Sequence, residues 1–240
     1  MQAIIMAAGR GVRLRPITER VPKCMVAVKG KPLLERVLTS VISAGITELN
    51  LVVGYKKEII EDHFGPKFEG VKITYFVQQE PKGTAHAVSL LQDYIKGKFF
   101  VANADVLAST RDYKRLIRVD EDEEFNGLVL ARKDPEPWKY GVIKTKGNMV
   151  DYIVEKPNPD KEPSNLVNAG IYRFDSDFMD AVMATGLSQR GEYELVDSMR
   201  NYIAAGKRVD CVRCEDKCVD ISDIEDLKMA NQMDEAIFPK

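Results

Sequence analysis

A short apolar strand that runs directly into a glycine- and arginine-rich loop is the feature that most constrains this chain. Residues 3–6 have the length and composition of a buried strand, and Gly9 and Gly11 follow among several arginines. Pro32 opens a segment whose apolar residues recur at helical spacing, and residues 49–53 form a second apolar strand pattern. This order of strand, loop, helix and strand, within about 50 residues, predicts a βαβ unit with a right-handed crossover and a parallel sheet.

The remainder of the chain continues this alternation and then becomes richer in strands. Further helices are expected at residues 58–64, 85–91, 192–204 and 224–233. Further strands are expected at residues 72–77, 99–102, 128–131, 142–144, 152–154 and 167–174. The acidic run at residues 120–124 is typical of a solvated helix end or loop. Because the sequence has no repeat, linker or clean boundary, we expect one α/β domain over residues 1–240 whose second half extends the same sheet.

Composition limits the classes of protein to which this chain can belong. Its 240 residues are enough for one large domain with a full core. Hydrophobic residues make up 45% and charged residues 30%, which leaves no case for disorder. The formal net charge of −2 argues against nucleic acid as a partner, so any anionic ligand must be held by local charge. No segment approaches the roughly 20 apolar residues of a membrane span, and we expect a cytoplasmic protein without a membrane partner.

The loop after the first strand has the composition of a binding site for triphosphate oxygens. It leaves the carboxyl edge of the sheet, where open α/β folds bind ligands. Its glycines let the backbone approach an anion, and its cations add charge that phosphate oxygens attract. The expected contacts come from the backbone of Ala8, Gly9, Gly11 and Val12 and from the side chains of Arg13 and Lys23.

Two familiar phosphate loops do not fit these residues. A dinucleotide fingerprint needs a third glycine where Leu14 stands, and a Walker A loop needs Ser or Thr where Pro32 follows Lys31. A basic surface loop with tight turns is the remaining alternative when this segment is taken alone.

Residues 7–32 read AAGRGVRLRPITERVPKCMVAVKGKP and closely resemble the signature of the sugar-1-phosphate nucleotidylyltransferases, G-x-G-T-R-L-x-P-x-T followed by P-K and K-P. Val12 departs from the usual Thr and removes one hydroxyl group. The resemblance covers about residues 1–231 and implies a Rossmann-like α/β fold with a mixed, mostly parallel sheet flanked by helices. It also implies a nucleotide-binding half near residues 1–125 and a sugar-binding, β-rich half near residues 126–240.

The segment QQEPKGTA at residues 78–85 resembles the part of these enzymes that recognises the base. Gln78 lies five positions before Gly83, which is the spacing of the uridylyl and thymidylyl members, and an amide can pair with a pyrimidine. Gly83 is expected to allow close approach of the nucleotide, and Thr84 is expected to cap the following helix. His86 is expected to be a structural or surface residue and not a catalyst. The segment favours UTP or dTTP, although a polar turn before a helix is the alternative.

Two aspartates resemble the metal ligands of the family. Asp105 ends the apolar strand at residues 99–102, and Asp220 begins DISDIEDL, which resembles the late pattern D-x-G-T-x-E-D-L. Mg²⁺ prefers one or two carboxylates together with phosphate oxygens. Ala104 replaces the usual Gly, and its methyl group is expected to narrow the pocket. Asp223 is expected at the helix N-cap.

Three cysteines, Cys211, Cys214 and Cys218, have a spacing that could ligate zinc with one more donor or support a disulfide. The resemblance instead places a strand and a tight turn here, and a cytosolic chain usually keeps such thiols reduced. Their role stays open.

The sugar side of the site is implied by three short segments. The resemblance assigns Gly141 in YGV to close approach of sugar hydroxyls, and Glu155 and Lys156 in EKP to sugar hydroxyls and the sugar phosphate. Asn168 and Gly170 in the strand NAGIY complete this set. Each segment alone is an ordinary strand or turn, and their order and spacing carry the interpretation.

The resemblance therefore implies a Mg²⁺-dependent transfer of a nucleotidyl group from UTP or dTTP to a sugar 1-phosphate, with release of pyrophosphate. Arg13 and Lys23 are expected to stabilise charge on the transferred group, and Asp105 and Asp220 to hold Mg²⁺. A mannose-1-phosphate guanylyltransferase, a glycosyltransferase of similar fold and a regulatory nucleotide-binding subunit are alternatives. The identity of the sugar and the formation of a homo-oligomer stay open.

Overall fold

The computed structural model describes residues 1–118 and 125–233. The strands are β1 (Gln2–Ala7), β2 (Ala27–Val28), β3 (Lys31–Pro32), β4 (Glu48–Val53), β5 (Lys67–Phe68), β6 (Val71–Val77), β7 (Phe99–Asn103), β8 (Val106–Leu107), β9 (Gly127–Lys133), β10 (Gly141–Lys146), β11 (Met149–Glu155), β12 (Leu166–Phe174), β13 (Val209–Arg213) and β14 (Val219–Asp220). The α-helices are α1 (Leu33–Ala44), α2 (Lys57–Phe64), α3 (Thr84–Ser89), α4 (Thr110–Ile117), α5 (Phe178–Met183), α6 (Leu195–Ala204) and α7 (Ile224–Gln232). Short 3-10 turns are η1 (Val12–Leu14), η2 (Ile17–Glu19), η3 (Lys23–Met25) and η4 (Pro137–Lys139).

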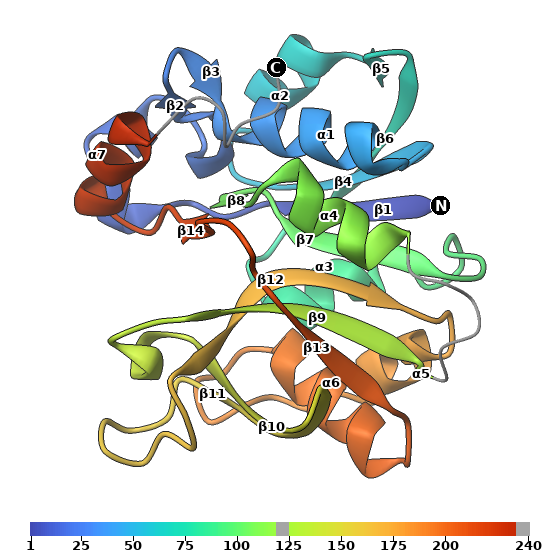
Figure 1. The fold of residues 1–240 in the computed structure, drawn as a ribbon. Helices are drawn as coiled ribbons and strands as arrows, with labels where there is room; N and C mark the ends of the chain where they lie inside the picture. The colour runs from blue at the N-terminus through green and yellow to red at the C-terminus, as the bar shows by residue number, and fades with distance from the viewer. Residues whose placement is uncertain (119–124, 234–240) are drawn as a thin grey trace.

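Strands from both halves of the sequence join one sheet (Figure 1). Its ten strands lie in the order β10-β11-β13-β9-β12-β7-β1-β4-β6-β5. Neighbouring strands from β7 through β1 and β4 to β6 are parallel, whereas β12 runs antiparallel to both β7 and β9. The expected mixed α/β sheet and its extension by the second half are therefore confirmed.

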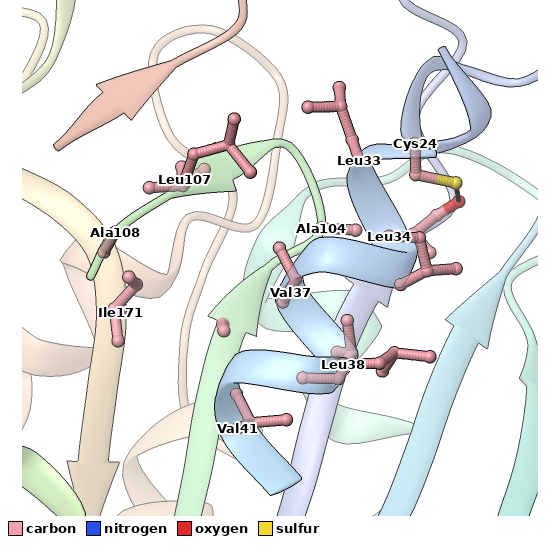
Figure 2. Close-up of a cluster of buried hydrophobic side chains, with 14 of the residues drawn as sticks. Cys24, Leu33, Leu34, Val37, Leu38, Val41, Ala104, Leu107, Ala108 and Ile171 are labelled. Carbon is pink, nitrogen blue, oxygen red and sulfur yellow. Dashed lines mark hydrogen bonds between the residues drawn. The ribbon is translucent and has the colours of Figure 1, made fainter. Parts of the chain in front are cut away.

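Each face of the sheet is covered by its own helices, because side chains of a strand alternate between the two faces. Ile5 of β1 belongs to the cluster packed with α1, α2 and α4, and its neighbour Ile4 belongs to the cluster packed with α3, α5 and α6. Figure 2 shows Leu34, Val37 and Leu38 of α1 directed at the sheet. Alternate residues of β1 and the apolar residues on one side of α1 thus pack together on one face of the sheet.

Sequence patterns missed two helices and misplaced the start of a third. In α4 the exposed residues are mostly charged, and Tyr113 and Leu116 are its buried apolar residues, so the apolar stripe is too narrow to recognise. The short α5 was also missed. The helix expected from residue 192 begins at Leu195, because the residues before it bind to another loop by hydrogen bonds. The acidic run at residues 120–124 lies outside the described residues.

Within the described ranges 1–118 and 125–233, none of the helices has the length and apolar character that crossing a membrane requires.

Candidate active site

The glycine loop after β1 closes against the segment that carries Lys23. Gly11 has a left-handed backbone with φ of 63°, and a Cβ at this position would lie 2.7 Å from Lys23 Cβ. Thr18 Oγ1 donates a hydrogen bond of 2.8 Å to the Gly11 carbonyl oxygen. A Cβ on Gly9, in contrast, would meet nothing within 4 Å, and Gly9 lines a cavity of about 260 Å³. Gly11 therefore shapes the loop, whereas Gly9 leaves backbone open to the cavity.

Lys23 lies between two carboxylates that are 115 residues apart in the sequence, Asp105 and Asp220. Its ammonium donates a hydrogen bond to Asp105, and its Nζ lies 3.8 Å from Asp220 Oδ1. The backbone fixes this arrangement, since β14 pairs with β8 and places Asp220 opposite Val106. The Ile221 N–H also donates a 3.0 Å hydrogen bond to the Asp105 carbonyl oxygen. The two predicted metal ligands are thus brought together.

The charges of this cluster depend on one another. Burial alone lowers the pKa of Lys23, but the carboxylates of Asp105 and Asp220 outweigh burial, and the pKa of Lys23 is raised. Burial, followed by the negative charge of Asp105, raises the pKa of Asp220 to about 6. Asp220 Oδ1 is buried and has no hydrogen-bond partner among the described residues. One cation therefore balances two carboxylates, one of which retains an unsatisfied oxygen.

These two carboxylates fit the donor set that Mg²⁺ requires. Mg²⁺ is usually bound through one or two carboxylates plus phosphate oxygens of a substrate. Asp105 and Asp220 would supply the protein ligands, and Asp220 Oδ1 is a buried carboxylate oxygen that receives no hydrogen bond from the described residues. A metal ion held here would neutralise charge on a triphosphate.

The cavity beside this cluster gathers most of the predicted nucleotide-binding residues. Lys23 and Asp105 line it together with Gln78, Gly83 and Thr84, and backbone from the β1 loop completes the wall. These residues come from four separated stretches of sequence at the carboxyl edges of β1, β6 and β7. The cavity is therefore a candidate site for the nucleotide.

Ala104 touches this cavity but lies mostly in the core. Its exposed fraction is 1%, and it belongs to the cluster beneath α1, where Figure 2 shows it near Leu34. Its N–H donates a 3.1 Å hydrogen bond to the Met6 carbonyl oxygen. Ala104 is therefore a core residue that also lines the cavity.

Gln78 is held by two hydrogen bonds that both involve its amide nitrogen. Nε2 donates to the Gly83 carbonyl oxygen at 3.0 Å and lies 2.9 Å from His86 Nδ1. The side chain is buried, with a relative exposure of 7%. Its orientation is thus fixed before any ligand is present.

The loop that carries Gly83 is braced by the segment before α6. Tyr193 N–H donates to the Lys82 carbonyl oxygen at 2.8 Å, and Ala85 N–H donates to the Tyr193 carbonyl oxygen at 2.8 Å. Gly83 has φ of 111°, and a Cβ there would lie 2.4 Å from the Tyr193 carbonyl oxygen. The close approach that this glycine permits is therefore to the backbone of Tyr193, and Gly83 also lines the cavity.

The expected cap of α3 is also wrong. Gly83 is the N-cap residue of α3 and Thr84 is the first residue of the helix, without a side-chain cap. The Thr84 hydroxyl instead accepts a 2.9 Å hydrogen bond from Leu195 N–H, at the start of α6. It satisfies an orphan amide of a helix that lies 111 residues away.

Three of the predicted sugar-binding residues meet around Gly141. A Cβ at Gly141 would lie 3.0 Å from Glu155 Oε2, 3.1 Å from Val196 Cγ2 and 3.5 Å from Asn168 Cβ. The pairing of β10 with β11 places Gly141 opposite Glu155. The absence of a side chain at Gly141 therefore allows Glu155, Val196 and Asn168 to pack closely against this backbone.

Asn168 and Gly170 shape a bulge in β12. The register of β12 with β9 shifts between Asn168 and Tyr172, and Gly170 has φ of 71°. Gly170 N–H donates a 2.8 Å hydrogen bond to Asn168 Oδ1. The amide nitrogen Nδ2 of Asn168 donates a hydrogen bond to the Tyr172 hydroxyl. A Cβ at Gly170 would lie 2.3 Å from Asn103 Nδ2. The Asn168 amide therefore has partners within the strand.

Glu155 lies among charges of both signs. Arg190 Nη1 lies 3.5 Å from Glu155 Oε1 and 3.0 Å from Glu194 Oε1, and Lys156 Nζ lies 3.7 Å from Glu155 Oε1. Burial, then the charge of Glu194, raises the pKa of Glu155 to about 7. This carboxyl group can carry a proton near neutral pH.

Three predicted residues lie at the rim of the site. Val12, Arg13 and Lys156 are exposed, and the charge of Arg13 reaches Lys23, whose pKa it lowers slightly against the rise caused by the carboxylates. Long cationic side chains at a rim can move toward an anionic ligand.

Sequence reasoning missed several residues of the site. Asn103 and Glu192 line the nucleotide cavity, and Arg190 and Glu194 surround Glu155. The end of an apolar strand is a signal that could have identified Asn103, two residues before Asp105.

The cysteines are free thiols. Cys24 donates a hydrogen bond from its thiol to the Ala7 carbonyl oxygen at 3.8 Å, and Cys211 lies on β13. A hydrogen bond to Cys218 and burial raise the pKa of Cys214. Within residues 1–118 and 125–233, no three His, Cys, Asp or Glu residues gather in a way that could hold a metal.

Comparisons with known proteins identify the family and the fold. A profile of the nucleotidyl transferase family matches residues 2–236. The chain is 37% identical over 234 residues to UTP–glucose-1-phosphate uridylyltransferase AglF of Haloferax volcanii, covering 97% of this chain and 96% of that protein. It is also 37% identical over 208 residues to the bifunctional protein GlmU of Methanococcus maripaludis, covering 86% of this chain and 48% of GlmU.

The fold has a counterpart among solved structures. A UDP-glucose pyrophosphorylase complexed with UDP-glucose superposes with a TM-score of 0.88 at 26% sequence identity, covering 96% of each chain.

Proposed function

This chain belongs to the nucleotidyl transferase family, and we propose that it transfers a uridylyl group from UTP to the phosphate of a hexose 1-phosphate. The observation that carries the proposal is the Lys23 ammonium between Asp105 and Asp220, at the wall of a cavity that Gln78 also lines. The name of AglF, which is similar over almost its whole length, supports UTP and glucose 1-phosphate as the first substrates to test.

The proposed reaction needs positioning and charge neutralisation and no nucleophilic side chain. A phosphate oxygen of the sugar 1-phosphate forms a bond to the α-phosphorus of UTP. The bond from that phosphorus to the bridging oxygen of the β-phosphate breaks, and pyrophosphate leaves. Mg²⁺ held by Asp105 and Asp220 would supply charge stabilisation at the triphosphate.

The residues of this chain have separate roles in the proposal. Backbone amides of the β1 loop near Gly9 bind the triphosphate, and Lys23 with Arg13 stabilises charge on the transferred group and on pyrophosphate. Gln78 recognises the base. Lys156 attracts the sugar phosphate, and Glu155 accepts hydrogen bonds from sugar hydroxyls.

The test is release of pyrophosphate from a panel of five nucleoside triphosphates with several sugar 1-phosphates, in the presence of Mg²⁺. We expect the largest kcat/KM with UTP, and turnover with dTTP as the runner-up. Turnover with GTP and mannose 1-phosphate alone would make the chain a guanylyltransferase. Failure to release pyrophosphate from any pair, combined with sugar transfer from a nucleotide sugar, would identify a glycosyltransferase.

A further inference from the structure

We propose that His86 determines the base preference of the nucleotide site by holding the amide of Gln78 in one orientation. The inference rests on the proposed function, since it assigns Gln78 to the base. His86 lines a separate cavity of about 190 Å³ with Lys82 and Tyr193. It therefore acts on a ligand through Gln78 and is a positioning residue.

The neighbours of Gln78 fix which end of its amide is the nitrogen. The Gly83 carbonyl oxygen only accepts hydrogen bonds, so the amide atom 3.0 Å from it is the donor Nε2. The same Nε2 lies 2.9 Å from His86 Nδ1. Because an amide nitrogen does not accept, His86 Nδ1 must be the acceptor, and the neutral ring carries its proton on Nε2.

This pair of hydrogen bonds determines what Gln78 can offer to a base. Both protons of its amide nitrogen are directed at groups of the protein, so the side chain presents its oxygen, an acceptor, to a ligand. Uracil and thymine carry a donor N3–H that pairs with an acceptor. Cytosine has a lone pair at N3 in the same place and is repelled by that oxygen. The fixed amide therefore favours UTP and dTTP over CTP.

Loss of the acceptor on His86 removes one of the two hydrogen bonds that hold the Gln78 amide. The Gly83 carbonyl alone then holds the amide, so a rotated amide that presents its NH₂ group to N3 of cytosine costs one hydrogen bond less than in the wild type. The Gly83 carbonyl stays in place, because the backbone of Tyr193 braces its loop through two hydrogen bonds of 2.8 Å. Substitution of His86 thus weakens the restraint on the orientation of Gln78 without dismantling the loop.

The experiment compares the affinities of UTP and CTP in the full chain with Mg²⁺, measured by titration calorimetry. The variants are His86→Leu, which has no acceptor, and His86→Asn, whose side-chain oxygen can accept in place of Nδ1. Loss of one hydrogen bond weakens UTP binding about 10-fold, so the ratio of the CTP and UTP dissociation constants should fall by about that factor in His86→Leu. His86→Asn should keep a ratio close to that of the wild type.

Steady-state kinetics provide a second readout. In His86→Leu the KM for UTP should rise while kcat stays near its wild-type value, because the lost contact acts on ground state and transition state alike. Should His86→Leu fail to fold in thermal melts, His86→Phe is the replacement, because its ring has no acceptor nitrogen.

An unchanged UTP:CTP ratio in the apolar variant, or an equal loss in His86→Asn, would overturn the role of His86. Failure of the proposed function has a different signature, since wild-type protein would then show no preference for UTP and no release of pyrophosphate.

Discussion

Lys23 Nζ lies 3.8 Å from Asp220 Oδ1, a buried oxygen for which the described residues provide no hydrogen bond. The ammonium group therefore occupies the place where positive charge is most needed, between Asp220 and Asp105. A divalent cation and the phosphates that accompany it would share this charge balance with Lys23.

Substitution Asp105→Asn should abolish turnover far more than it weakens substrate binding. It keeps the shape of the side chain but removes a charge from the cluster, and loss of several kcal/mol of charge stabilisation corresponds to about a 1,000-fold fall in kcat. Pyrophosphate release and calorimetric binding of UTP would be measured on the same preparation. Asp223→Asn is the matched control, because Asn also caps helices and Asp223 is the N-cap of α7. Near-normal turnover of Asp105→Asn would remove Asp105 from the metal site.

Substitution Lys23→Met should destabilise the chain and make its stability depend on Mg²⁺. Without the ammonium, Asp105 and Asp220 lose the cation that lies between them, and breaking such a partly buried pair costs about 3 kcal/mol. Mg²⁺ should restore much of the lost Tm in the variant and raise the wild-type Tm less, because a ligand stabilises the state that binds it. Thermal melts with and without Mg²⁺ measure both effects. Equal shifts in the two proteins would contradict this interpretation of the cluster.

Two glycines of the β1 loop should respond oppositely to alanine. Gly11→Ala puts a side chain on a left-handed backbone and against Lys23, and should lower the free energy of unfolding by about 2 kcal/mol. Gly9→Ala meets open space and should leave stability unchanged, while raising the KM for the nucleoside triphosphate. Urea unfolding and steady-state kinetics separate the two. A Gly9→Ala variant with unaltered KM would show that the triphosphate does not approach this backbone.

Glu155 should make the chain less stable as the pH rises through the acid to neutral range. Burial and Glu194 raise the pKa of this carboxyl from its usual 4.5 to about 7, so between these values the folded state binds more protons than the unfolded state. Stability is therefore greatest below pH 4.5 for this group and is lost as the pH rises to about 7, by about 3 kcal/mol in total. Glu155→Gln should remove this slope in urea unfolding measured from pH 5 to 8. Glu58→Gln, an exposed substitution on α2, should leave the slope as it is.

UTP binding should weaken at low pH through His86. Burial, then the charge of Lys82, lowers the pKa of His86 below its usual 6.5, while Glu80 opposes them. Tyr193 is the other titratable group near the ring, with centroids 6.5 Å apart. Protonated Nδ1 becomes a donor that faces the donor Nε2 of Gln78, so the affinity should be constant from pH 8 to 6.5 and fall below that. The pH dependence of UTP affinity in His86→Asn serves as the control, because UTP itself also takes up protons at low pH. Identical pH dependence in the wild type and in His86→Asn would exclude a role of His86 protonation.

The sequence was sufficient to predict the face of the sheet that α1 covers and to bring Asp105 and Asp220, the predicted metal ligands, to one site. The apolar spacing of β1, α1 and β4 is regular, and the motifs around Asp105 and Asp220 place both residues at strand ends. Helix α4 was missed because its exposed residues are mostly charged and its two buried apolar residues do not form a recognisable helical pattern. A capping signal was present there, since the Ser109 hydroxyl accepts a hydrogen bond from Asp112 N–H at 3.1 Å.

Contacts between distant segments could not be predicted in the same way. Thr84 has the sequence context of a local helix cap, yet its partner is Leu195, and Gly83 makes room for Tyr193. Such pairs depend on how the second half of the chain folds back, and no local spacing encodes them. The orientation of Gln78 likewise depends on its hydrogen bonds to Gly83 and His86.

The backbone brace at Tyr193 has a consequence for engineering this chain. Its hydrogen bonds come from main-chain atoms of the second half, and they hold the loop that presents Gln78 from the first half. In a chimera that joins the first half of this chain to the second half of a relative, the loop that presents Gln78 would therefore pack against a segment from the relative in place of Tyr193. Exchange of sugar specificity by recombination should therefore replace a segment that contains residues 141–170 and keep Tyr193 of this chain, so that the brace and the loop stay together.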